Sequence, residues 1–155
     1  MREVGPADAT LTVKTYREGV GAVVGHDLII VVTRWSAKVG DDGAIELSAD
    51  PRSLEVREGL RGAKPLSDRD RREILKTIDK KVLGGSPIEF RGTTDAESIT
   101  GELTMAGATR PLTAELTPDG GRASVTQSEW GIKPYRGLMG ALKVRDDVEV
   151  IVSGL

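Results

Sequence analysis

The stretch GELTMAGATRPLTAEL, residues 101–116, decides the fold that this sequence predicts. Leu103 and Met105 alternate with polar residues in its first half, and Leu112 opens the same alternation in its second half. A period of two places the apolar side chains on one face of a strand. Gly107, between the halves, readily takes positive φ. We therefore expect a β-hairpin with one apolar face.

The turn and the second strand of this hairpin carry two further expectations. Ala106 precedes Gly107 and argues against a two-residue type I′ turn, which needs positive φ at both central positions. We expect a type I turn that Gly107 closes as a left-handed bulge. Pro111 has no N–H, so an unpaired or bulged position is expected where the second strand begins.

Alternating or apolar runs predict strands in other parts of the chain as well. The longest candidate covers residues 26–39 and places Val31 and Trp35 on the same face. Turn sequences at 41–43 and 118–121 join neighbouring strands. The other expected strands cover residues 11–15, 45–49, 54–56, 88–91, 123–127 and 148–152.

One long helix is expected over residues 67–83. Ser67 is a good N-cap residue, and Gly84 and Gly85 end the pattern. Ile78 belongs to an apolar stripe along this helix. The helix therefore interrupts the strands once, after the fourth of them.

These elements predict an all-β fold, mainly antiparallel, with about eight strands and one inserted helix. Tight turns between strands indicate antiparallel pairing. Eight strands suffice to close a barrel whose interior holds side chains or one small ligand. A length of 155 residues predicts a single domain over 1–155.

Composition limits the function classes. A net charge of −2 gives no basic surface for a nucleic-acid partner, and the absence of cysteine excludes disulfides and thiolate chemistry. No apolar stretch approaches the roughly 20 residues of a transmembrane helix. The N-terminus lacks a basic start followed by an apolar run, so we expect no signal peptide and a cytoplasmic location.

Five sequence features, in order along the chain, resemble those of the YceI-like proteins. The hairpin matches the pattern G-x-L-x-hydrophobic-x-G-x-T-[RK]-P-hydrophobic over residues 101–112. The others are the pair Gly25-His26, a Pro-x-x-Phe-x-Gly run at 87–92, Trp130-Gly131-Ile132, and the ending LKVRDDV at 142–148. No one of these is specific, but together they cover most of the chain.

The resemblance implies a lipocalin-like β-barrel with a helix packed near one mouth. Characterised members of the family hold a polyisoprenoid chain inside the barrel, and many are exported to the periplasm. We expect this chain to depart from the family in having no signal peptide, and it lacks the aromatic-rich second strand, where Trp35 stands nearly alone. Fewer aromatic residues imply a wider, a differently shaped or a smaller cavity.

His26 is the only histidine, so a metal or acid–base site there would need carboxylates to complete it. The favoured interpretation is a backbone hydrogen bond or a place near the barrel mouth, where His26 is the polar candidate. The pairs Asp41/Asp42 and Asp146/Asp147 fall in predicted turns and are interpreted as solvated loop charges. No catalytic residue and no metal site are predicted.

Apolar residues from the strands, the helix and the final bend are expected to line the barrel interior. The same residues could instead meet in a packed centre, because small barrels do both. Methionine slightly favours a flexible apolar ligand. The expected lining residues are Val31, Trp35, Leu47, Val56, Ile78, Phe90, Leu103, Met105, Leu112, Trp130 and Met139.

The leading hypothesis is non-catalytic binding or carriage of a hydrophobic or amphiphilic isoprenoid-like lipid in the barrel. It requires no cofactor beyond a polyisoprenoid or fatty-acid-like lipid as the bound small molecule. The alternative is an interaction or stress-response module with a packed barrel that acts through a homodimer surface. A small enzyme using His26 is less favoured.

Overall fold

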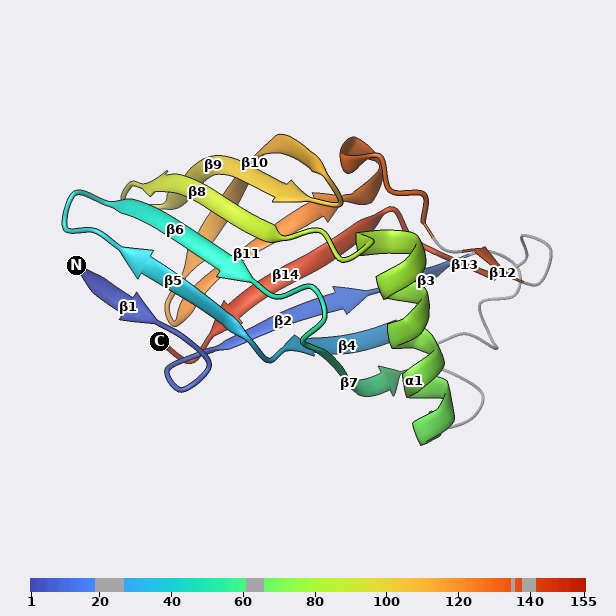
Figure 1. Cartoon of the computed structure of the whole chain (residues 1–155). Helices are drawn as coiled ribbons and strands as arrows, with labels where there is room; N and C mark the ends of the chain where they lie inside the picture. Colours follow the sequence, from blue (N-terminus) through green and yellow to red (C-terminus); the bar gives the residue numbers. More distant parts are fainter. Residues whose placement is uncertain (19–26, 61–65, 135, 138–141) are drawn as a thin grey trace.

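The computed structural model describes residues 1–18, 27–60, 66–134, 136–137 and 142–155 (Figure 1). Helix α1 (Asp68–Thr77) continues into the π-helical turn η2 (Ile78–Leu83), and a 3-10 turn, η3 (Gln127–Trp130), lies near the C-terminus. The strands are β1 (Arg2–Val4), β2 (Thr10–Thr15), β3 (Arg17–Glu18), β4 (Asp27–Val32), β5 (Trp35–Val39), β6 (Ala44–Ala49), β7 (Leu54–Leu60), β8 (Ile88–Thr94), β9 (Ser98–Met105), β10 (Ala108–Thr117), β11 (Gly120–Thr126), β12 (Arg136–Gly137), β13 (Leu142–Val144) and β14 (Asp147–Ser153).

Within the described residues, eleven strands form one antiparallel sheet in the order β1-β5-β6-β8-β9-β10-β11-β14-β2-β4-β7. The short strands β12, β13 and β3 form a second, small sheet. Figure 1 shows the large sheet curling, so that β8 and β9 lie across from β2 and β4, with α1 standing beside one end of the curl. The predicted class, an all-β barrel-like fold with one helix, is confirmed.

The strand count differs from the prediction of about eight. The N-terminal β1 pairs with β5 and was not expected, and the predicted strand over residues 26–39 divides into β4 and β5. The helix follows β7, which is the strand predicted as the fourth, and the extra strands lie before it in the chain. Short strands such as β1 carry too few residues for a periodic pattern to identify them.

The two ends of the strand order are joined by the chain itself. β4 lies between β2 and β7 near one end of the order, and β5 lies between β1 and β6 near the other. Only Thr33 and Arg34 separate β4 from β5 along the chain. The sheet thus curls back on itself at this corner. The connections from β1 to β2 and from β6 to β7 also run from a strand paired with β5 to a strand paired with β4.

Ser53 holds the corner together. Its carbonyl oxygen accepts hydrogen bonds from the backbone N–H of Thr33 and from the Thr33 hydroxyl, each at 2.7 Å. Its side-chain oxygen accepts from the backbone N–H of Arg34 at 3.0 Å and donates to the carbonyl oxygen of Asp50 at 2.8 Å. The Arg34 guanidinium also pairs with the Asp50 carboxylate at 2.8 Å. Because Ser53 is buried, few water molecules can replace these bonds.

The corner reverses which residues of the chain face inward. Ile30 and Val32 are buried on β4, whereas Trp35 and Ala37 are buried on β5. The step from Val32 to Trp35 spans three residues, so even-numbered inward positions give way to odd-numbered ones. The expectation that Val31 shares a face with Trp35 is therefore wrong, because a period of two holds only within an uninterrupted strand.

The hairpin predicted over residues 101–116 is present as β9 and β10, with Met105 paired to Ala108. Its turn differs from the prediction, because Ala106 at φ 50° and Gly107 at φ 78° both have positive φ. This two-residue loop has the positive φ values of a type I′ turn, whose twist matches that of the strands. Pro111 pairs regularly with Glu102 in a part of β10 that pairs with β9 alone, so the expected bulge is absent.

The predicted helix start is confirmed. The Ser67 hydroxyl accepts from the backbone N–H of Asp70, and the Asp70 carboxylate accepts from the backbone N–H of Ser67, each at 3.1 Å. This capping box satisfies N–H groups that the first turn leaves open. Gly84 ends η2 with φ 61°, and the Arg71 guanidinium donates to the carbonyl oxygens of Val56 and Arg57 on β7.

Two clusters of buried apolar side chains lie on the inner side of the curl. The first surrounds Trp35 at the corner, and the second surrounds Trp130, whose indole N–H donates to the carbonyl oxygen of Leu103 at 2.8 Å. The first cluster contains Val4, Ala9, Leu11, Val32, Ala37 and Ala49, and the second contains Leu103, Val125, Ile132 and Val148.

We predict that Ser53→Ala lowers the free energy of unfolding by about 1–3 kcal/mol, because it removes the acceptor of the Arg34 backbone N–H and the donor to the Asp50 carbonyl oxygen. Urea unfolding measures the change. Ser36→Ala, at an exposed position of β5, is the control and should change stability by less than about 0.5 kcal/mol. Equal effects of the two substitutions would contradict the role assigned to the corner.

Ala106→Gly should raise the free energy of unfolding by about 0.5–1 kcal/mol, because glycine removes the steric cost of positive φ at this position. Thermal and urea unfolding both report the change. Ala44→Gly at the start of β6 is the matched control, and it should destabilise, since there glycine adds only chain entropy to the unfolded state. A loss of stability in Ala106→Gly would refute the assigned turn type.

Candidate functional site

A hollow of about 780 Å³ lies on the inner side of the curled sheet. Its walls are almost wholly aliphatic. Alternate residues of several strands contribute, so that β4 supplies Leu28, Ile30 and Val32 and β14 supplies Val148, Val150 and Val152. The period of two in these strands thus builds a continuous apolar wall from segments distant in sequence.

The helical segment forms one side of the hollow. Ile74 of α1 and Ile78, Val82 and Leu83 of η2 face the hollow together with Glu73 and Thr77. Their spacing is that of one helix face, as the apolar stripe predicts. In Figure 1 this segment crosses one end of the curl, next to β7 and β4.

Seven of the eleven predicted lining residues border the hollow: Trp35, Leu47, Ile78, Phe90, Leu103, Met105 and Leu112. Val31, Val56 and Trp130 do not line it. Met139 and the mouth candidate His26 lie outside the described residues. Whether any of these residues contacts a ligand stays a prediction.

The three residues that miss the hollow do so for different reasons. Val31 lies on the other face of β4, because the inward-facing residues are even-numbered before the corner and odd-numbered after it. Val56 is 2% exposed and opposite Ile30, on the strand that α1 packs against. Trp130 is also 2% exposed, and it fills the space beside Leu103 and Val125 rather than bordering the hollow.

Sequence reasoning also missed part of the wall. The last strand was expected and its alternation was recognised, yet Val148, Val150 and Val152 were not assigned to the interior. Their alternation with Glu149 was the available signal. Ile30 and Val32 were missed because the strand over 26–39 is apolar on both faces in its first half, which leaves its inward face undetermined.

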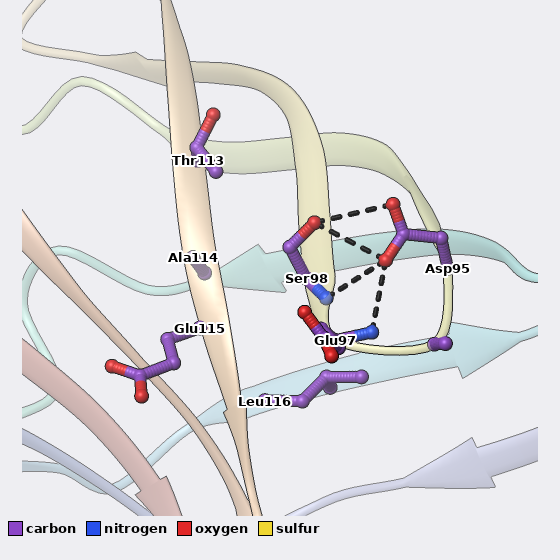
Figure 2. A pocket seen from close by; sticks show the side chains of 8 residues that line it. Asp95, Glu97, Ser98, Thr113, Ala114, Glu115 and Leu116 are labelled. Atoms are coloured by element: carbon purple, nitrogen blue, oxygen red, sulfur yellow. Dashed lines mark hydrogen bonds between the residues drawn. The ribbon is translucent and has the colours of Figure 1, made fainter.

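A second hollow, of about 810 Å³, lies at the β8–β9 turn and is lined by residues 95–98 and 113–116. Figure 2 shows Asp95 beside Ser98 and Glu97, across from Thr113 and Glu115 on β10. The Asp95 carboxylate accepts from the backbone N–H groups of Glu97 and Ser98 at 2.9 Å each and from the Ser98 hydroxyl. These bonds shape a turn, so we regard the inner hollow as the candidate site.

Each of the paired carboxylates has a local partner. The Asp42 carboxylate accepts from the backbone N–H of Ala44, and Asp41 lies within 3.3 Å of the N-terminal ammonium group. Asp146 accepts from the backbone N–H of Ser128, and Asp147 accepts from the Thr126 hydroxyl at 2.7 Å. The interpretation as loop charges fits Asp42 and Asp146, whereas Asp147 begins β14 and lies opposite Thr126 of β11.

The described parts of the chain hold neither a metal-binding cluster of side chains nor a membrane-spanning helix. No group of three or more histidine, aspartate or glutamate side chains is placed to hold a metal ion there. Nor does any helix in those parts have the length and apolar character needed to cross a membrane.

Residues 7–154 match the model of the YceI-like domain. A solved structure described as a polyisoprenoid-binding domain from Saccharophagus degradans, implicated in plant cell wall breakdown, has a similar fold, with a TM-score of 0.52. It is 10% identical and the match covers 99% of this chain and 97% of that one. No curated protein matches the chain.

The Asp95 turn predicts a pH dependence of stability. The backbone N–H groups of Glu97 and Ser98 hold the pKa of the Asp95 carboxyl below its ordinary value. Its contribution is therefore complete above the unfolded-state pKa of about 3.9 and is lost as the pH falls through the lower folded-state pKa. The stability difference between wild type and Asp95→Ala should be present at pH 6 and should shrink below pH 4.

Urea unfolding between pH 7 and pH 2.5 measures this difference. Glu102→Ala, at an exposed position of β9, is the control. The difference in stability between wild type and this variant should not shrink in the same way as the pH falls. A gap between wild type and Asp95→Ala that stays constant across the range would contradict the hydrogen bonding assigned to the turn.

Proposed function

Because this chain belongs to the YceI-like family, we propose that it binds a hydrophobic or amphiphilic isoprenoid-like lipid in the inner hollow without catalysing a reaction. The observation that carries the proposal is the hollow itself, about 780 Å³ with walls of aliphatic side chains. Sites for small molecules commonly have volumes of about 300–1,000 Å³. This hollow is therefore of a suitable size for one lipid chain.

The chemistry of the wall suits a hydrocarbon chain. Each methylene group transferred from water to an apolar environment contributes about 0.8 kcal/mol. A chain of a dozen carbons thus gains enough free energy to bind without many polar contacts. The aliphatic lining from β2, β4, β14 and η2 offers such an environment along the whole hollow.

The structural neighbour supports the same class of ligand. It is described as a polyisoprenoid-binding domain, and its fold is shared over nearly the full length of both chains. At 10% identity the likeness carries the fold, and the ligand class remains our proposal for this chain. A bound polyisoprenoid or fatty-acid-like lipid would occupy the space between the helix and the strands.

Binding is favoured over catalysis by the roles of the polar residues. Asp42 and Asp146 hydrogen-bond backbone N–H groups at turns, and the residues that line the hollow are mostly apolar. The alternative of a packed barrel acting through a homodimer surface requires side chains to fill the interior, and a hollow of this volume argues against it.

The proposal predicts that lipid copurifies with the protein and that filling the hollow displaces it. Solvent extraction and native mass spectrometry should find an isoprenoid or fatty lipid bound to the purified chain. Ala123→Phe places a large side chain in the hollow and displaces about two methylene groups, worth about 1.6 kcal/mol. It should weaken binding of geranylgeraniol roughly 10-fold, measured by isothermal titration calorimetry.

Ser124→Phe is the matched control, because Ser124 neighbours Ala123 on β11 and is exposed on the other face. It should leave the affinity for geranylgeraniol unchanged. A purified protein that carries no lipid and does not bind geranylgeraniol would overturn the proposal. Equal losses in both variants would show that the lipid binds somewhere other than the hollow.

A further inference from the structure

Trp35 combines two properties that its surroundings do not explain. The residue is 7% exposed, lines the hollow and packs among aliphatic side chains of the corner cluster. Its indole N–H, which is a hydrogen-bond donor only, has no acceptor in the structure. A buried N–H without an acceptor costs stability, because it has lost water and gained nothing in exchange.

Trp130 shows what a fully satisfied indole looks like in the same chain. It is more deeply buried than Trp35, at 2% exposed, and its N–H donates to the carbonyl oxygen of Leu103 at 2.8 Å. Trp130 does not line the hollow, whereas Trp35 does. The unsatisfied tryptophan is therefore the one that faces the space proposed for the ligand.

Other polar groups of the wall follow the same pattern. Among the described residues, four buried side-chain polar atoms have no hydrogen-bond partner, and three of them belong to residues that line the hollow. These three are on Thr15, Trp35 and Thr94. Thr15 ends β2 on the helix side, whereas Thr94 ends β8, which runs away from the helix (Figure 1).

We propose that the Trp35 indole N–H donates a hydrogen bond to a neutral oxygen of the bound lipid. This inference rests on the proposed function and names the chemistry of the ligand. The indole can only donate, so the ligand atom must be an acceptor. The neighbours Val4, Leu11, Ala37 and Ala49 offer no opposite charge, so an ionised group would be buried unpaired.

The oxygen is accordingly an ether, carbonyl or hydroxyl oxygen rather than a carboxylate or phosphate. Because neighbouring atoms cover Nε1, a small rotation of the indole accompanies binding. The ligand class is thus an isoprenoid-like chain that carries a neutral oxygen at the corner of the sheet. A plain hydrocarbon fills the same space and leaves the indole unsatisfied.

Two probes of equal shape test this inference. One is geranylgeranyl methyl ether, and the other is the hydrocarbon with a methylene group in place of the ether oxygen. The ether should bind wild-type protein about 5-fold more tightly, which corresponds to one net hydrogen bond. In ¹H–¹⁵N spectra the ether should move the Trp35 indole N–H resonance downfield, and the Trp130 resonance should stay in place as an internal reference.

Trp35→Phe keeps an apolar ring at the corner and removes the donor. It also identifies the Trp35 resonance, since that signal disappears from the spectrum. The 5-fold advantage of the ether over the hydrocarbon should vanish in this variant. Comparing the two probes within the variant cancels any change that the smaller ring makes to both affinities. The spectrum of the wild-type protein tests the inference even if the variant folds poorly.

The possible failures are distinguishable. If both probes bind wild-type protein equally and the Trp35 resonance does not move downfield with the ether, the hydrogen bond is refuted and lipid binding stands. If neither probe binds, the proposed function fails and this inference fails with it. If the ether advantage survives in Trp35→Phe, another group accounts for it and Trp35 is not the donor.

Discussion

The bend between β4 and β5 is the constraint on which the rest of the structure depends. Sheet curvature has to bring the inner faces of distant strands together. In this chain β4 lies near one end of the strand order and β5 near the other, and only Thr33 and Arg34 separate the two strands. The hydrogen bonds of Ser53 satisfy the backbone that the bend takes out of the ladders. Both the period change at the corner and the inward position of Trp35 follow from this bend.

The hollow follows from the curl together with the composition. Aliphatic residues from many strands cover the inner face, but few large rings fill the space between them. Among the described aromatic residues only Trp35 and Phe90 border the hollow, whereas Trp130 closes a separate cluster. An aromatic side chain buries about 150–250 Å², so their scarcity leaves volume that aliphatic chains do not occupy.

Local sequence patterns predicted the helix and most strands, but they did not predict the corner or which residues of β4 face inward. Ser67, Gly84 and the alternation around Leu103 act within a few residues, so the helix ends and the hairpin were predictable. The corner depends on Ser53, some twenty residues from the atoms it binds, and no local period reports that contact. For the same reason Val31 was assigned inward, and positive φ at Ala106 was not expected of a residue with a Cβ atom.

The contacts of Arg71 with β7 affect how the edge of the sheet can interact with other protein molecules. β7 is the last strand of the sheet order, and the end strand of a sheet can pair with a strand from another molecule. Two carbonyl groups of β7 already accept hydrogen bonds from the Arg71 guanidinium, and α1 packs against the same strand. At the opposite end, β1 has only three residues. The helix that walls the hollow thereby also shields the sheet from edge-to-edge aggregation.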